Sequence, residues 1–170
     1  MRYKIVRLIN VTFVTVSLFN LSLKAQRNMN TTENPNPIFT KGEKTSSDYF
    51  TGTAWLHVLV PKDETGSYTV GDVVFEPGSR NNWHTHPAGQ ILLVTDGHGF
   101  YQERGKNARL LSKGDVVVIP SNIEHWHGAT KDSRFTHIAI TNITEKGAVN
   151  WLKPVTDEEY KSCHMAEVKK

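Results

Sequence analysis

The chain has 170 residues with 20 Lys and Arg against 17 Asp and Glu, a formal net charge of +3. Residues 1–25 hold four of those basic residues and no acidic one, so the remainder has a net charge of −1. That remainder contains no stretch in which clustered Lys or Arg alternate with aromatic residues, which excludes a nucleic-acid-binding surface. A single cysteine, Cys163, allows no intramolecular disulfide, so a hydrophobic core must stabilise the fold.

Residues 1–25 have the pattern of a secretory signal peptide. Arg2, Lys4 and Arg7 precede an apolar run, and the small residues Ser22 and Ala25 follow it at the spacing of a cleavage site. A retained membrane anchor is the alternative, but polar residues interrupt an apolar stretch that is already short for spanning a bilayer. We therefore expect cleavage, export to the periplasm or the extracellular space, and no stable membrane insertion afterwards.

Residues 26–47 are polar and are predicted to be a linker or an N-terminal arm, and residues 48–170 one domain. Short apolar runs bounded by turn residues predict strands at residues 54–60, 68–75, 82–86, 90–95, 97–102, 109–111, 116–119, 124–128 and 135–141. Many short strands at this spacing are typical of an all-β sandwich or barrel. The capping box that begins at Thr156 and ends at Glu159 predicts one short C-terminal helix.

Two histidine-rich stretches carry the chemistry. His84 and His86 are separated by one residue, which directs both side chains to the same face of a strand, and His125 and His127 repeat that spacing. Six of the eight histidines lie between residues 84 and 137, a clustering that packing does not explain. Imidazole nitrogens with an amide oxygen from Gln90 would form a mixed site for Mn, Fe, Zn, Ni or Co.

The spacing of these residues resembles the two motifs of the cupin superfamily. Gly78, the His84 and His86 pair, Gln90 and Gly97 follow the first motif, and Gly114, Pro120 and His125 follow the second. The resemblance implies a single-domain jelly-roll β-barrel. Gln90 stands where the superfamily usually has an acid, Asn122 replaces a glycine, and Ala129 replaces an asparagine. Asparagine tolerates the left-handed backbone conformation that such a turn requires.

A closer resemblance is to small bacterial cupins that include the manganese-dependent hydroxynitrile lyases. It rests on residues 83–90, 125–129 and 136–140. It implies His84, His86, Gln90 and His125 as ligands of one divalent metal, with manganese the first expectation, and His127 and His137 as pocket histidines with a catalytic role. It also implies a homodimer and a small-molecule substrate.

The resulting functional hypothesis is a metal-dependent enzyme that performs lyase-type acid–base chemistry on a small hydroxy or carbonyl compound. The neutral Gln90 leaves the full charge of the ion uncompensated, which would make it a stronger Lewis acid. His127 has the parity of His125 and would move the proton, or else serve as a further ligand or a spacer. His137 is either a pocket histidine or one that orients a ligand. The alternatives are a dioxygenase or decarboxylase-like cupin, and a non-catalytic binding module.

Overall fold

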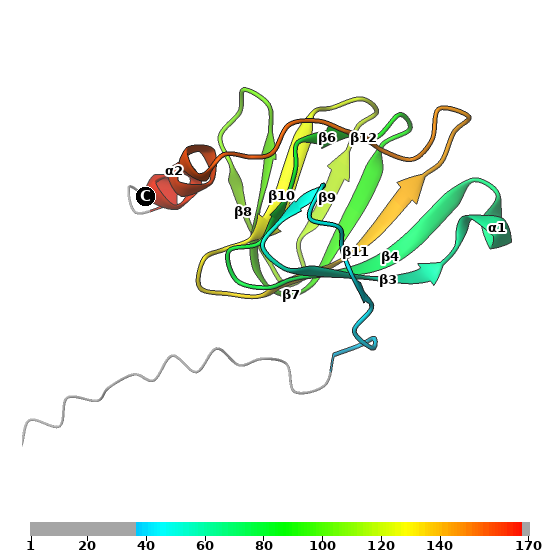
Figure 1. Ribbon diagram of the computed structural model, residues 1–170, viewed down its shortest axis with the longest axis horizontal. Coiled ribbons are helices and arrows are strands. Elements are labelled where there is room, and N and C mark those ends of the chain that lie inside the picture. Colours follow the sequence, from blue (N-terminus) through cyan, green and yellow to red (C-terminus); the bar gives the residue numbers. More distant parts are fainter. Residues whose placement is uncertain (1–36, 168–170) are drawn as a thin grey trace, which may run out of the picture. The chain divides into compact units, whose positions relative to one another are not determined.

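The computed structural model describes residues 37–167, which fall within one compact unit (Figure 1). The predicted signal peptide, and the part of the predicted arm that precedes residue 37, lie outside the described residues. Among the residues described, no helix is long and apolar enough to cross a membrane.

Twelve strands and two short helices make up the described part of the chain, and the predicted all-β class is confirmed. The elements are β1 (Glu43–Lys44), β2 (Phe50–Thr51), β3 (Ala54–Val60), α1 (Lys62–Thr65), β4 (Tyr68–Phe75), β5 (Arg80–Asn81), β6 (His84–Thr85), β7 (Gln90–Glu103), β8 (Arg109–Ser112), β9 (Val116–Ile119), β10 (His125–Ala129), β11 (Phe135–Asn142), β12 (Asn150–Trp151) and α2 (Asp157–Glu167).

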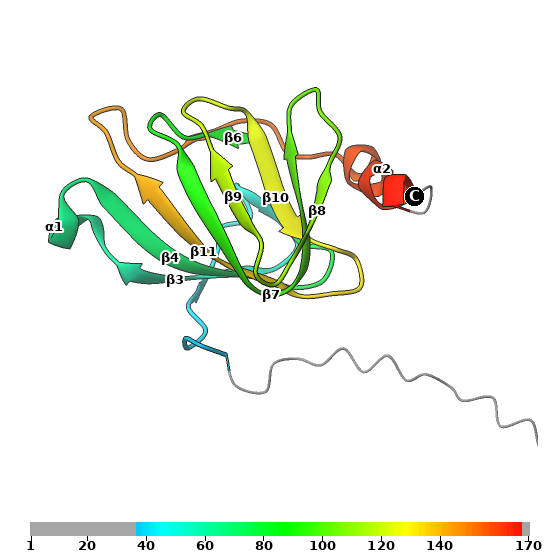
Figure 2. The ribbon, with the colours of Figure 1, turned by 180° about the vertical axis from the view of Figure 1, so that it is seen from behind.

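The strands form two antiparallel sheets that curve toward each other as a half-barrel (Figures 1 and 2). The first sheet contains β1, β3, β4, β11, β9 and the first half of β7. The second contains β2, β5, β6, β12, β8, β10 and the second half of β7. Strand β7 is thus the element that the two sheets share.

The predicted break between residues 95 and 97 is wrong, because β7 runs through it without interruption. Gly97 has φ +70°, and the pairing of β11 with β7 shifts register between Thr136 and His137. This bulge bends the strand from one sheet into the other, so the residues expected to form a turn form a bend instead. A β-carbon at position 97 would collide with the carbonyl oxygen of Arg134, which explains why glycine is needed there.

Other differences from the sequence predictions are local. The strand predicted at 82–86 is shortened to β6, and the turn residues between the strands predicted at 54–60 and 68–75 contain the single helical turn α1. Strands β1, β2, β5 and β12 have two residues each and were not predicted, since so short a segment is defined only by its pairing partner. Strand β1 lies inside the predicted arm and pairs with β3. Asn122 has φ 62°, the left-handed conformation expected of it.

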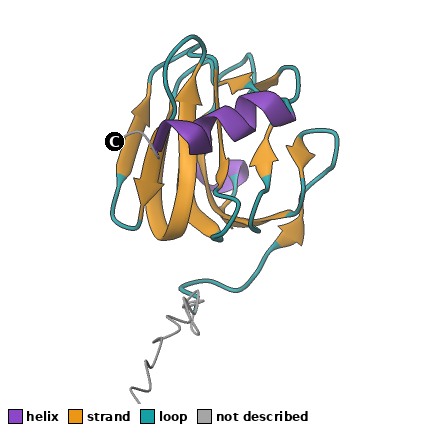
Figure 3. Cartoon of the chain, turned by 90° about the vertical axis from the view of Figure 1, so that its left-hand side faces the viewer, coloured by secondary structure: helices purple, strands orange, loops and turns teal. Residues whose placement is uncertain are grey.

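The main core fills the space between the sheets. It consists of inward-facing side chains of both sheets, namely Ala54, Val73, Phe75, Leu92, Val94, Tyr101, Leu111, Val117, Ile119, Ala129 and Phe135. A second cluster lies on the outside of the second sheet, where Trp83 and Trp126 pack against Tyr160 and Cys163 of α2 (Figure 3). The predicted capping box begins α2, with Glu159 N donating to Thr156 Oγ1 and Thr156 N donating to Glu159 Oε2.

Candidate metal centre

Strand pairing brings the two histidine stretches together inside the half-barrel. His84 of β6 lies directly opposite His125 of β10, and their ring centroids are 4.2 Å apart. Alternation along β10 directs His125 and His127 inward while Trp126 between them faces α2. One nitrogen from each of His84, His125 and His127 lies within 4.8 Å of the others, a cluster that could hold a metal ion.

Backbone carbonyls fix the protonation of three of these imidazoles. The Nδ1 atom of His84 lies 2.9 Å from Asn82 O, that of His86 2.6 Å from Ala148 O, and that of His125 2.8 Å from Ile123 O. A carbonyl oxygen can only accept, so each Nδ1 carries the hydrogen and each Nε2 keeps its lone pair. Histidines that bind metals are usually held in this way.

Four buried polar atoms lack a hydrogen-bond partner among the described residues: His86 Nε2, Gln90 Oε1, His125 Nε2 and His137 Nδ1. An unsatisfied buried acceptor costs about 1–3 kcal/mol, so several together call for a ligand. The amide of Gln90 is oriented by Thr141, whose Oγ1 accepts from Nε2 at 2.8 Å and leaves Oε1 with no partner. Three of the four atoms belong to predicted ligands, and imidazole nitrogens with an amide oxygen fit a divalent transition metal.

His86 and His127 differ in a way that bears on which of them would bind the ion. The ring of His86 is 5.0 Å from that of His84 and 5.5 Å from that of His125, and His127 lies at similar distances of 5.5 and 6.0 Å. Both ring nitrogens of His127 have hydrogen-bond partners, whereas Nε2 of His86 has none. The unpartnered nitrogen favours His86 as the ligand and leaves His127 to other chemistry.

His127 is held by Asn81 and His137. The backbone N–H of His127 donates to Asn81 Oδ1 at 2.9 Å, which turns the amide nitrogen Nδ2 toward the imidazole, 3.0 Å from Nε2. The same Nδ2, which can only donate, lies 3.3 Å from Nδ1, so the shorter contact indicates Nε2 as the nitrogen that accepts. The Nδ1–H of His127 then donates to His137 Nε2 at 3.2 Å. The ring of Phe75 lies edge-on to His127, with centroids 5.7 Å apart, and covers this pair.

All five of these histidines are buried, and burial is the largest cause of their lowered pKa values. The pKa of His125 falls to about 4 and that of His137 to about 3. The pKa of His86 is lowered, and the pKa values of His84 and His127 fall well below the usual range because neighbouring imidazoles add to the effect of burial. Neutral imidazoles are the form that binds metals and accepts protons.

Sequence reasoning did not identify Asn81, Thr141 or Phe75, which orient and cover the predicted site residues. Asn81 occupies an unspecified position within the first motif, and Thr141 and Phe75 occupy ordinary strand positions outside the motifs, so no sequence signal distinguished them. The remaining described histidines are hydrogen-bonded elsewhere: His57 to Thr40, His98 to Ser112, and His164 to Tyr160 and Lys131.

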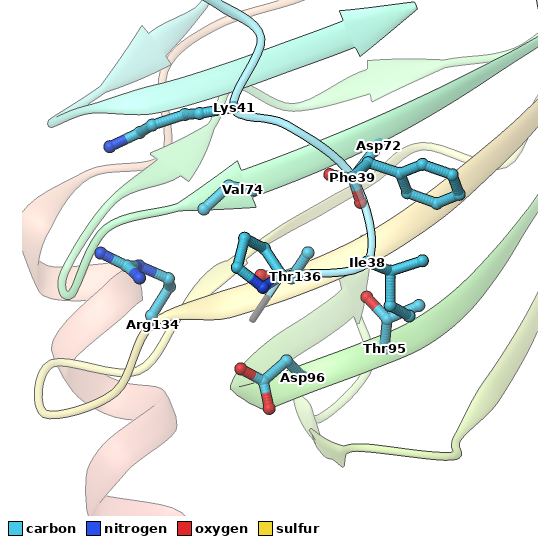
Figure 4. Close-up of a pocket in the computed structure, with 10 residues that line it drawn as sticks. Ile38, Phe39, Lys41, Asp72, Val74, Thr95, Asp96, Arg134 and Thr136 are labelled. Atoms are coloured by element: carbon cyan, nitrogen blue, oxygen red, sulfur yellow. The ribbon is translucent and has the colours of Figure 1, made fainter. Parts of the chain in front are cut away.

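A small pocket of about 110 Å³ lies apart from these histidines, on the outer face of β4 and β11 (Figure 4). The segment that contains Ile38 and Phe39 crosses these strands and forms one wall of the pocket. Lys41 anchors the end of this segment, since its Nζ lies 2.9 Å from Glu76 Oε1 and over the ring of Trp55. None of the site histidines lines this pocket.

Comparison with known proteins gives a consistent result. Residues 71–141 match the model of the family described as the cupin domain. An (R)-mandelonitrile lyase from Granulicella tundricola is 41% identical over 118 residues, which are 69% of this chain and 90% of the relative. A cupin-like protein from Thermotoga maritima is 53% identical, with a TM-score of 0.73 over 75% of this chain and 97% of the other. An acireductone dioxygenase from Bacillus velezensis is 30% identical over 66 residues, 36% of this chain and 37% of the relative.

Proposed function

The chain belongs to the cupin family, and we propose that it is a metal-dependent lyase that converts a small hydroxy compound, such as a cyanohydrin, into a carbonyl compound. One observation carries the proposal. A set of buried nitrogen and oxygen atoms without partners lies beside a hydrogen-bonded pair of neutral histidines. The first feature is what a metal centre requires, and the second can accept and return a proton. The similarity to the mandelonitrile lyase supports this choice among cupin reactions.

His84, His86, Gln90 and His125 would hold the metal, with manganese as the first candidate and Fe, Zn, Ni or Co also compatible with these ligands. When bound, a divalent ion would supply Lewis acidity toward the substrate hydroxyl. Three neutral imidazoles and one amide leave the positive charge of the ion uncompensated, which strengthens this effect. The Thr141 hydroxyl keeps the amide oxygen, rather than the amide nitrogen, free for the metal.

His127 would be the base. Its Nε2 would exchange the hydrogen bond from Asn81 Nδ2 for the hydroxyl proton, the electron pair of that O–H bond would form the C=O bond, and the C–C bond would break with its electrons leaving on cyanide. The resulting imidazolium would return the proton to cyanide, releasing hydrogen cyanide and the carbonyl product. His137 would stabilise the imidazolium by accepting the Nδ1–H, a bond that strengthens when its donor is charged. Asn81 would keep the ring oriented.

The test is His127→Gln, which keeps a polar side chain in this buried position but removes the imidazole base. General acid–base catalysis contributes about 10²–10⁴-fold, so cyanohydrin cleavage should fall by at least about 100-fold. The metal content measured by elemental analysis should stay at the wild-type level. The exposed histidine variant His98→Ala is the matched control and should retain both properties. Full cleavage activity in His127→Gln would contradict the assigned role.

A dioxygenase is the second candidate, because the acireductone dioxygenase shares 30% identity over 66 residues and the same ligands suit iron. An oxygenase would consume O₂ during turnover and would be active only with a redox metal. An oxygen electrode therefore separates the two: a lyase cleaves cyanohydrins at the same rate with and without O₂.

A further inference from the structure

A second, larger pocket of about 620 Å³ lies at the open mouth of the half-barrel. Its wall contains the aromatic side chains of Tyr49, Phe50 and Trp151 and the aliphatic side chains of Leu56 and Val58. This volume lies within the range of pockets that bind small molecules, which is roughly 300–1,000 Å³.

Leu56 and Val58 are exposed although they face the barrel interior. Along β3 they share a face with Ala54, which is buried in the core, and Leu56 lies opposite the core residue Val73 of β4. Leu56 is nevertheless 39% exposed and Val58 49% exposed. An apolar surface that lines the inside of a barrel and stays uncovered is typical of a ligand site.

The pocket shares a wall with the histidine site. Trp151 of β12 pairs with His84 of β6, and their ring centroids are 4.9 Å apart. On its other side Trp151 stacks on Tyr49 at 4.8 Å and meets the edge of Phe50 at 5.7 Å. Phe50 in turn packs against Phe75, the ring that covers His127, with centroids 5.9 Å apart. A molecule whose reacting group reaches the histidines would therefore place its other end against these aromatic rings.

From this geometry we propose that the pocket binds an aromatic or bulky apolar group on the substrate, and that Trp151, Phe50 and Leu56 determine substrate specificity. This inference rests on the proposed function only in assuming that the reacting end of the substrate lies at the histidines. Lys41, one of the cations at the rim, is held by Glu76 and the ring of Trp55. Glu43 and Lys44 also line the pocket, so its polar side carries charges of both signs, whereas the aromatic and aliphatic wall favours an apolar substituent.

The residues that form the pocket wall and the residues that would perform the chemistry come from different parts of the sequence. The matched cupin region covers residues 71–141 and contains all of the proposed ligands together with His127 and His137. The wall comes from β2 and β3 before this region and from β12 after it. Proteins that share the histidine motifs can therefore differ in this wall, and the same acid–base site would then act on different substrates.

Binding can be measured without turnover, on the full chain, by calorimetry with benzyl alcohol and ethanol. Benzyl alcohol should bind at least 10-fold more tightly than ethanol. Trp151→Leu should weaken the binding of benzyl alcohol at least 10-fold and leave ethanol binding and the metal content unchanged. His98→Ala, at an exposed position outside this pocket, is the control and should behave as the wild type.

Val58→Phe provides a second variant at a half-exposed position, so the inference does not depend on the folding of Trp151→Leu. The added ring should fill the mouth and reduce benzyl alcohol binding at least 10-fold while leaving ethanol binding unchanged. Equal affinities for benzyl alcohol and ethanol in the wild type, or wild-type benzyl alcohol binding in both variants, would overturn the inference.

The same proteins separate this inference from the proposed function. If the protein cleaves cyanohydrins, Trp151→Leu should lower the ratio of kcat/KM for a phenyl-bearing cyanohydrin to that for acetone cyanohydrin at least 10-fold. If no cyanohydrin is cleaved, but benzyl alcohol binding depends on Trp151 as described, the pocket assignment stands and the proposed reaction fails.

Discussion

Removal of the metal should destabilise the fold by an amount that the unpartnered atoms allow us to estimate. His86 Nε2, Gln90 Oε1 and His125 Nε2 are buried acceptors without partners, and each such atom costs about 1–3 kcal/mol. The metal-free protein therefore carries a penalty on the order of 3–9 kcal/mol that a bound ion would relieve. Free metal at about 1,000 times Kd stabilises the folded state by about 4 kcal/mol. For a domain of this size, that corresponds to an increase in Tm of roughly 10–20 °C.

The assay is thermal unfolding of the full chain with excess chelator and with added Mn, Fe or Zn, each followed by circular dichroism. His125→Ala should remove the difference between the two conditions, because it deletes a ligand and its orphaned nitrogen. His98→Ala should retain the full difference, since that imidazole lies on the surface. A wild-type Tm that is the same within about 1 °C under all conditions would show that these atoms do not bind a metal, and would refute the reasoning from their burial.

Three further predictions concern the scaffold around the site. Gly97→Ala forces a β-carbon against a backbone carbonyl in a left-handed conformation that itself costs about 1–2 kcal/mol. Gly105 has a similar φ but open space around it, so Gly105→Ala is the control. Denaturant titration should show a loss of stability at position 97 at least twice that at position 105. Thr141→Val removes the acceptor that orients the Gln90 carboxamide and should weaken metal affinity about 10–100-fold in a chelator competition. Thr136→Val, on the outer face of the same strand, should leave metal affinity unchanged. Equal metal affinities in the two variants would contradict the orienting role of Thr141. Thr156→Ala removes one half of the capping box and should cost about 1 kcal/mol; faster labelling of the single buried cysteine would report the loosened helix, and an unchanged rate would argue against it.

Local sequence patterns were sufficient for most of the strands and for the C-terminal helix. The predicted strands at 54–60, 68–75 and 116–119 coincide with β3, β4 and β9, because each is an apolar run between clear turn residues. The prediction of a turn at Asp96 and Gly97 was wrong, because an Asp-Gly pair can form either a hairpin turn or a bend between two sheets. The neighbouring strand decides between the two, and that strand is β11, some forty residues later in the chain.

The sequence by itself determined the family, the barrel class and the set of histidines, because metal-binding side chains on strands must recur at a spacing of two and must be followed by turns that glycine or asparagine can form. It also led to the proposal that His127 performs the proton transfer, which stays a prediction. Only the tertiary structure decided how these residues are held. Asn81, Thr141, Phe75 and Trp151 act through contacts with histidines and a glutamine that lie 46 to 67 residues away in the chain. Such contacts arise when two curved sheets close on a common interior, and no local pattern records them.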